Sequence, residues 1–173
     1  MAGAAAEASD RGYAVVTLEE PVVGEARIAA RDHLERVAVL ARGARRPLCV
    51  ISCGETVVTV VGRGRGGRNQ EFALAWAGAL ATPGTGLSAT AFSDLSPIML
   101  ASIGTDGVDG PTDAAGALVD ETTIARARAA GIGDPQQCLR DNNAYALFSA
   151  VGDLIHTGPT NTNVGDLQIV LLA

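Results

Sequence analysis

A glycine- and arginine-rich loop in the sequence contains residue types that bind anions. Residues 62–71 read GRGRGGRNQE, with several glycines and three arginines at the start of a helical pattern. Glycines let a backbone approach a ligand closely, a helix N-terminus presents free N–H groups, and guanidinium groups form forked hydrogen bonds with phosphate or carboxylate. The loop therefore predicts an anion site, although a solvated connecting loop would have a similar composition. The expected contacts with the anion are Arg65, Gly66, Gly67, Arg68 and Asn69.

The same loop formally contains the pattern G-x-G-x-x-G, through Gly62, Gly64 and Gly67. A nicotinamide cofactor site would also need an acidic residue about 20 positions further on. Thr82, Pro83 and Gly84 occupy those positions, and no Gly-Lys-Ser/Thr follows the glycines. The sequence therefore argues against a dinucleotide fold and against a P-loop.

A second polar loop, residues 104–113 with the sequence GTDGVDGPTD, follows an apolar run at 97–103. Ligands of open α/β sheets bind at the carboxyl ends of strands. Carboxylates at such a place hold Mg²⁺ or orient a hydroxyl nucleophile, and Asp106 and Asp109 are the expected metal ligands. Because Asp and Gly are also common turn formers, a purely structural loop is the alternative.

A third polar loop, residues 157–167 with the sequence TGPTNTNVGDL, is rich in hydroxyl and amide groups. Thr160 and Asn163 are its expected donors to phosphate or substrate oxygens, and a loop closed by local side-chain hydrogen bonds is the alternative. The two histidines, His33 and His156, have no evident acid–base partner in the sequence, which favours positions at the surface or the rim of a site.

The hydrophobic patterning predicts the elements that must position these loops. Strands are expected at 13–18, 48–52, 56–61, 97–103, 153–156 and 167–172, with the run at 97–103 covered on both faces. Helices are expected at 26–41, 70–80, 121–130 and 135–151, the last with a possible break at 142–143. The short Cys53–Gly54 corner predicts a hairpin between 48–52 and 56–61. The order of elements indicates an α/β fold, a three-layer αβα sandwich with a mixed β-sheet.

Length and composition limit the class of protein. The 173 residues suit one domain, and the 47% hydrophobic content favours a folded core. The net charge of -6 argues against a nucleic-acid binder. No signal-peptide pattern opens the chain and no apolar run reaches the roughly 18 residues of a membrane span. The three cysteines have no metal-site spacing, so we expect free thiols and a cytoplasmic protein without a membrane partner.

Three segments together resemble a known family. GGRNQEFALA at 66–75, GTDGVDGPTDAAGA at 104–117 and TGPTNTNVGDL at 157–167 are similar, in this order, to signature blocks of the MOFRL domain. The residues CGET at 53–56 extend the resemblance, which covers essentially the whole chain. The MOFRL domain is the C-terminal domain of class II glycerate kinases, which are also called hydroxypyruvate reductases. Cys53 and Gly165 depart from the family pattern, which usually has Gly and Asn at these places.

The resemblance implies transfer of phosphate from ATP to glycerate, with Mg²⁺, to give 2-phosphoglycerate and ADP. It implies an active site in a cleft between this domain and an N-terminal kinase domain, which would be supplied in cis or in trans because residues 1–173 hold only the MOFRL-like domain. Arg68 and Asp106 would belong to the active-site region and act in catalysis, with Glu55 as a further substrate contact. Assembly into a homo-oligomer is also compatible with the resemblance.

Two other functions remain open on sequence grounds. The chain could be a stand-alone or truncated domain that binds an anion and catalyses nothing. It could also be an independent hydride-transferring reductase, which is the weakest of the three because no complete nicotinamide fingerprint is present.

Overall fold

The computed structural model describes residues 1–82 and 97–173, and its centre is a mixed sheet. Within these residues seven strands are hydrogen-bonded in the order β1-β3-β7-β4-β5-β6, with β2 also beside β3. β1 and β2 pair with β3 in parallel, whereas the pairs that involve β4, β5, β6 and β7 are antiparallel. The strands are β1 Ala14–Thr17, β2 Val22–Glu25, β3 Leu48–Val57, β4 Ile98–Gly104, β5 Gly116–Asp120, β6 Leu154–Ile155 and β7 Asp166–Leu172.

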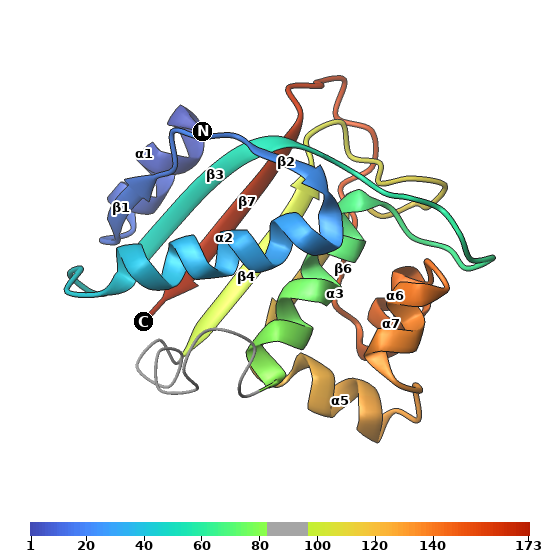
Figure 1. Cartoon of the computed structure of the whole chain (residues 1–173). Helices are drawn as coiled ribbons and strands as arrows, with labels where there is room; N and C mark the ends of the chain where they lie inside the picture. The colour runs from blue at the N-terminus through green and yellow to red at the C-terminus, as the bar shows by residue number, and fades with distance from the viewer. Residues whose placement is uncertain (83–96) are drawn as a thin grey trace.

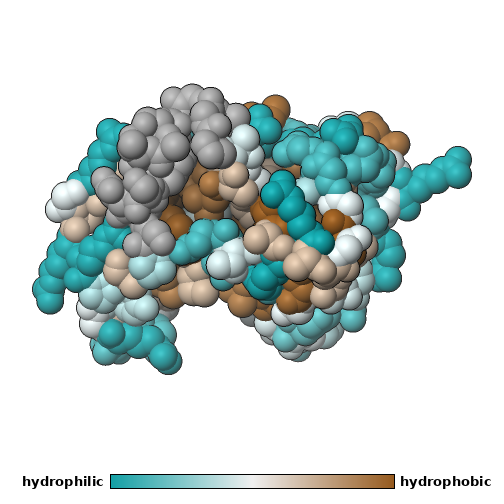
Figure 2. Space-filling view, turned by 90° about the horizontal axis from the view of Figure 1, so that it is seen from below, coloured by the Kyte–Doolittle hydropathy of each residue, from teal (hydrophilic) through white to brown (hydrophobic). Residues whose placement is uncertain are grey.

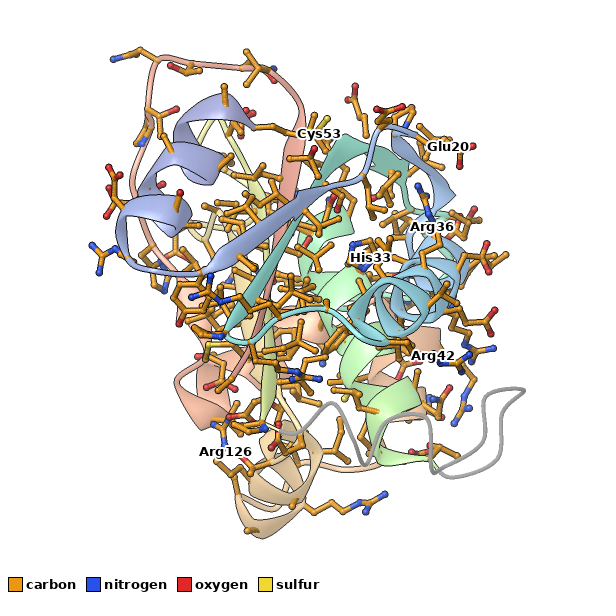
Figure 3. All side chains as sticks on the ribbon, turned by 90° about the vertical axis from the view of Figure 1, so that its left-hand side faces the viewer. Glu20, His33, Arg36, Arg42, Cys53 and Arg126 are labelled. Atoms are coloured by element: carbon orange, nitrogen blue, oxygen red, sulfur yellow. The ribbon has the colours of Figure 1, made fainter. Side chains whose placement is uncertain are left out.

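Helices lie on both faces of the sheet, which confirms the predicted αβα arrangement (Figures 1 and 3). Most of them cover one face, where they form the main apolar core with the sheet. The other face carries a single described helix, α1, whose alanines pack on Cys49 and Ile51 of β3. The sequence analysis missed α1, although alanine is the strongest helix former. The helices are α1 Ala2–Asp10, α2 Ala26–Ala41, α3 Arg68–Ala81, α5 Thr123–Ala129, α6 Pro135–Arg140 and α7 Ala144–Val151.

The predicted hairpin at Cys53–Gly54 is wrong, because residues 48–57 form one ten-residue strand, β3, and the rest of the second predicted strand, residues 58–61, is in no strand. Gly54 pairs with Asp166 of β7 on one side and with Val22 of β2 on the other. A Cβ atom at Gly54 would lie 2.0 Å from the Val22 carbonyl oxygen. The glycine therefore allows two strands to approach closely rather than allowing a turn.

Several local predictions near the C-terminal half are confirmed or refined. The long helix divides into α6 and α7 at the predicted break, and Asp134 caps α6 by accepting a hydrogen bond from the Gln136 N–H at 3.1 Å. β5 was missed, and α5 begins at Thr123, just after it. β4 is not buried on both faces: its exposure alternates, and Met99 remains 40% exposed. The reason is that α1 packs near β1, β3 and β7 and leaves this part of the sheet less covered.

His33 is a core residue, which corrects the prediction of a surface or rim position. Its side chain points from α2 toward the sheet, whereas Arg36 on the same helix reaches Glu20 (Figure 3). The His33 Nε2 atom lies 2.9 Å from the Ser52 Oγ atom, and that hydroxyl donates to Gln168 Oε1 at 3.1 Å. Burial, together with the positive charge of Arg36, lowers the pKa of His33 to about 3. The imidazole is therefore neutral at physiological pH and has a structural position.

The two ends of the sheet differ in character. The second and third polar loops lie at the top of Figure 1, beyond the end of β4 and the beginning of β7, and the first runs along the right-hand side between β3 and α3. Seen from the opposite end, apolar residues lie among hydrophilic ones (Figure 2). That end holds a hollow of about 260 Å³ whose lining includes Tyr13, Met99 and Leu171. Among the described residues no helix is long and apolar enough to cross a membrane.

Candidate functional site

The three polar loops meet at one edge of the sheet, as the strand directions require. β4 and β3 end where β7 begins, because both are antiparallel to it, and Gly54 and Gly104 both pair with Asp166. The second and third loops are bonded to each other. Thr105 donates through its N–H and its Oγ1 to the Gly165 carbonyl at 3.1 and 2.7 Å, and the Thr160 N–H donates to the Asp106 carbonyl at 3.0 Å. The first loop joins them through α3, which begins at Arg68.

Arg68 is held at this edge by a forked ion pair with Asp166. The Arg68 Nε atom donates to both carboxylate oxygens, at 2.7 and 3.0 Å, and Nη2 donates to Oδ1 at 2.9 Å. Arg68 Nη1 lies 3.7 Å from a carboxylate oxygen of Glu55, at the end of β3. The hydrogen bonds that Arg68 donates to Asp166 are the main cause that raises the pKa of Arg68, and the charges of Asp166, Glu55 and Asp109 add to it. The guanidinium group is therefore permanently charged and fixed in direction.

Asp166 and Asn69 form the buried support beneath Arg68. The Asn69 Nδ2 atom donates to Asp166 Oδ1 at 3.0 Å, and the Ser102 hydroxyl donates to Asn69 Oδ1 at 2.8 Å. The side chains of all three residues are almost fully buried. Asn69 thus has a supporting role in this structure, inward of the edge where it was predicted to contact phosphate. Asp166 was not singled out from the sequence, since only the sheet register places it next to α3.

The N-terminus of α3 is already occupied by a carboxylate of the chain itself. Asp109 accepts hydrogen bonds from the backbone N–H groups of Asn69 and Gln70, at 3.0 and 2.9 Å. Burial raises the pKa of Asp109, while these two bonds act in the opposite direction. Both oxygens of Asp109 are engaged, so the geometry lends no support to its predicted role as a metal ligand. Among the described residues no group of three or more His, Cys, Asp or Glu side chains could hold a metal ion.

The glycines of the first loop are needed for close packing within the chain. A Cβ atom at Gly67 would lie 2.3 Å from the Asp109 Cγ atom, and one at Gly110 would lie 2.6 Å from the Gly66 carbonyl oxygen. Gly62 and Gly64 approach the backbone of residues 141–143 in the same way. The glycines were predicted to let a ligand approach the backbone. In the structure they instead let two neighbouring segments, residues 109–110 and 141–143, approach it.

Arg65 points to a different group of residues from Arg68. Its guanidinium lies over the Tyr145 ring at 4.6 Å and donates to the Pro111 carbonyl at 3.4 Å. The Tyr145 hydroxyl donates to Asp113 at 2.8 Å, which lowers the pKa of that carboxyl. The structure thus does not bring Arg65 and Arg68 onto a common set of partners.

Asp106, Thr160 and Asn163 lie in the two bonded loops and are open to solvent to different degrees. Asp106 is half-buried and its Oδ1 atom accepts the Val108 N–H at 3.1 Å, whereas its Oδ2 atom has no donor among the described residues. The Thr160 hydroxyl donates to the Thr105 carbonyl, and Asn163 Oδ1 accepts the Gly165 N–H at 3.3 Å. Thr160 and Asn163 are exposed, so a substrate could reach them.

The sequence of residues 48–166 matches the pattern of the MOFRL family. The chain belongs to the MOFRL family. It is similar to the D-glycerate 2-kinase of Thermotoga maritima, with 40% identity over 168 residues that make up 95% of this chain and 37% of that protein. It is also 38% identical to the glycerate 2-kinase of Pyrococcus horikoshii over 173 residues, 97% of this chain and 36% of that protein.

The fold of this MOFRL chain is also found in a solved structure. The crystal structure of a glycerate kinase from Thermotoga maritima matches it with a TM-score of 0.83 and 40% identity. The match covers 98% of this chain and 39% of that protein. The MOFRL chain therefore spans little more than a third of the length of these relatives, and the resemblance stated from the sequence is confirmed.

A second buried network fixes the beginning of the glycine loop in this MOFRL domain. Glu71 of α3 is 1% exposed, and it accepts hydrogen bonds from Arg27 Nη2 at 2.9 Å and from the Asn142 amide. Asn142 Oδ1 in turn accepts the N–H groups of Val61 and Gly62, each at 2.8 Å. Its members come from distant parts of the chain, so no local pattern in the sequence could have revealed them.

The site as a whole presents one fixed cation among several carboxylates at an open edge of the sheet. Arg68 offers N–H groups that Asp166 does not use, and Asp106 offers a free carboxylate oxygen on the neighbouring loop. A guanidinium group can bind an anionic group, and a free carboxylate oxygen can accept a hydrogen bond from a hydroxyl group.

Proposed function

We propose that this chain is the C-terminal domain of a glycerate 2-kinase. It would take part in the Mg-ATP-dependent phosphorylation of glycerate to 2-phosphoglycerate, in a cleft shared with an N-terminal kinase domain supplied in cis or in trans. The observation that carries the proposal is the meeting of the three polar loops around Arg68, in a family whose relatives are named glycerate kinases. We place the reaction in the cytoplasm, where the three free thiols would stay reduced.

Each residue would act by position and charge, because phosphoryl transfer needs little covalent help from a protein. Arg68 would bind an anionic group of the bound substrates through its outward N–H groups. Asp106 would accept the hydrogen bond of the reacting hydroxyl and hold it toward the phosphate. Glu55, Thr160 and Asn163 lie on the same edge and would line the acceptor side of the cleft.

The described residues do not form a magnesium site by themselves. Asp109 is occupied as the cap of α3, and Asp106 by itself offers a single unpaired carboxylate oxygen. Mg²⁺ prefers six oxygen ligands in near-octahedral geometry and usually keeps several waters and substrate phosphates among them. We therefore assign no step through the ion to residues of this chain.

Reconstitution tests this function directly. The isolated chain should release no ADP from Mg-ATP and glycerate, because donor and acceptor must be held together and effective molarities of about 10⁵ M or more are lost without the other side of the cleft. Addition of an N-terminal kinase domain from a relative, fused or in trans, should produce glycerate-dependent ADP release. Failure of every such combination, with both parts folded, would favour the non-catalytic anion-binding domain. The glycine loop gives no support to the reductase alternative, because the G-x-G-x-x-G glycines are packed against the chain itself.

A further inference from the structure

We propose that Arg68 receives the carboxylate of the acceptor substrate, that Asp166 is the positioning residue for this contact, and that the nucleotide phosphates are bound elsewhere. The proposal rests on the proposed function, since it assigns one part of the substrate to this half of the site. The sequence left open whether the loop at 62–71 binds a phosphate or a carboxylate, and the proposal assigns the carboxylate to Arg68.

The first argument comes from the donors of Arg68. A guanidinium group has five N–H donors in a planar fork. Asp166 takes the Nε donor and one Nη2 donor, which form one side of the fork. The end of the fork, made of Nη1 and the remaining Nη2 donor, matches the two oxygens of a carboxylate. Among the described residues, Glu55 is the only partner near this end of the fork. Its Oε1 atom lies 3.7 Å from Arg68 Nη1, and 68% of its side chain is exposed. Glu55 is free to give way to a substrate carboxylate.

The second argument is the charge around Arg68. Asp166, Glu55 and Asp109 all act on its guanidinium group and raise its pKa. The three carboxylates reduce the attraction of the guanidinium group for a further anion, and the repulsion that they add grows with the charge of that anion. A carboxylate carries one negative charge, whereas the phosphates of a nucleotide carry several. The site therefore favours a singly charged carboxylate over a phosphate.

The third argument is that the remaining phosphate-binding features of the loop are already used. Asp109 accepts the N–H groups at the start of α3, and Gly66 and Gly67 pack against residues 109–110. Arg65 lies over Tyr145. A phosphate near Arg68 would thus find one guanidinium and no backbone cradle, unlike the phosphate sites that helix N-termini usually form.

Ligand titration of the full chain, followed by NMR, tests the proposal. The probes are D-glycerate, glycerol and inorganic phosphate at constant ionic strength, and the readout is the Arg68 Nε–Hε signal with the backbone signals of Glu55 and Asp166. D-glycerate should shift these signals in a saturable way, and glycerol, which lacks the carboxylate, should not. Phosphate should bind more weakly than D-glycerate. Tighter binding of phosphate, or no response of Arg68 to D-glycerate, would overturn the proposal.

Variants separate positioning from general stability. Arg68→Lys keeps the charge and removes the fork, so it should weaken D-glycerate binding about tenfold or more. Arg128→Lys makes the same change on an exposed arginine of α5 and should leave binding unchanged. Asp166→Asn removes a negative charge and the rigid hold, so the preference for D-glycerate over phosphate should shrink. A purely structural role of Asp166 would weaken both ligands alike and would contradict its assignment.

If Asp166→Asn fails to fold, the comparison of Arg68→Lys with the wild type still decides the carboxylate contact. These measurements need no turnover. Loss of the proposed kinase activity and failure of the carboxylate assignment can therefore be told apart.

Discussion

Replacement of Asp109 by alanine should destabilise the domain strongly, because this carboxylate caps α3. The change leaves the N–H groups of Asn69 and Gln70 without their acceptors in a buried place. A buried donor without a partner costs about 1–3 kcal/mol. Two such donors give a loss of about 2–6 kcal/mol, and entry of water into the space should bring the result near 3 kcal/mol.

The isosteric change Asp109→Asn should cost much less. Burial raises the pKa of Asp109, so its ionised form already loses part of what its hydrogen bonds contribute. An amide oxygen can still accept one of the two N–H groups, and we expect a loss of about 1 kcal/mol. The order alanine, asparagine, wild type, from least to most stable, is the signature of a cap.

Urea unfolding followed by circular dichroism measures these changes, and the slope with denaturant should stay constant. For a domain of this size about 3 kcal/mol corresponds to a fall of about 6–12 °C in Tm. Asp113→Ala is the control, since it removes an exposed carboxylate from the same loop and should change the midpoint far less. Equal stability of Asp109→Ala and Asp113→Ala would refute the capping role.

Three further predictions concern the framework of the site. The pKa of His33 falls from 6.5 to about 3 on folding, so between these pH values the unfolded chain binds more protons than the folded one. Stability is therefore lost as the pH falls from 6.5 toward 3, by at most ~1.4 kcal/mol per pH unit. His33→Gln should flatten the dependence of the urea midpoint on pH, and an unchanged slope would contradict this assignment. Gly67→Ala should lower Tm, because its Cβ atom would overlap Asp109, whereas Gly133→Ala, where nothing lies within 4 Å, should not; equal Tm values would refute this. Asn142→Ala should cost about 2–3 kcal/mol in urea unfolding, since two backbone N–H groups lose their acceptor and the buried Glu71 keeps only Arg27 as a donor. A loss below about 0.5 kcal/mol would show that the network is not needed.

Much of the fold could be predicted from patterns that are local in the sequence. The stretch 26–41 has a clear helical period and forms α2, and the Asp134–Pro135 pair begins α6 as expected. Each polar loop could be placed at the end of a strand, whereas their meeting at one edge depends on the antiparallel register of β7 with β3 and β4, which no local pattern shows. β3 could not be recognised as one strand, because Gly54 serves there for the approach of β2, which is a long-range contact.

The candidate site shows the same division. Arg68 and Asp106 could be selected because they stand in segments that resemble the signature blocks of the MOFRL family, at 66–75 and 104–117. The roles of Asp109 and Asp166 could not be predicted, because each depends on a partner about 40 or 100 residues away. As a result the sequence indicated a phosphate cradle at α3, where the folded chain supplies its own carboxylate.

The central claim, that this MOFRL domain contributes Arg68 and Asp106 to a glycerate kinase site, is tested most directly by the kcat of glycerate-dependent ADP release. The measurement compares the reconstituted wild type with Arg68→Ala, Asp106→Ala and the distant control Arg128→Ala. We expect each of the first two variants to lower kcat by roughly 10² or more, the scale of losing one preorganised charged group, and the control to match the wild type. Full activity of both variants, in reconstituted enzyme that turns over normally, would contradict the assignment.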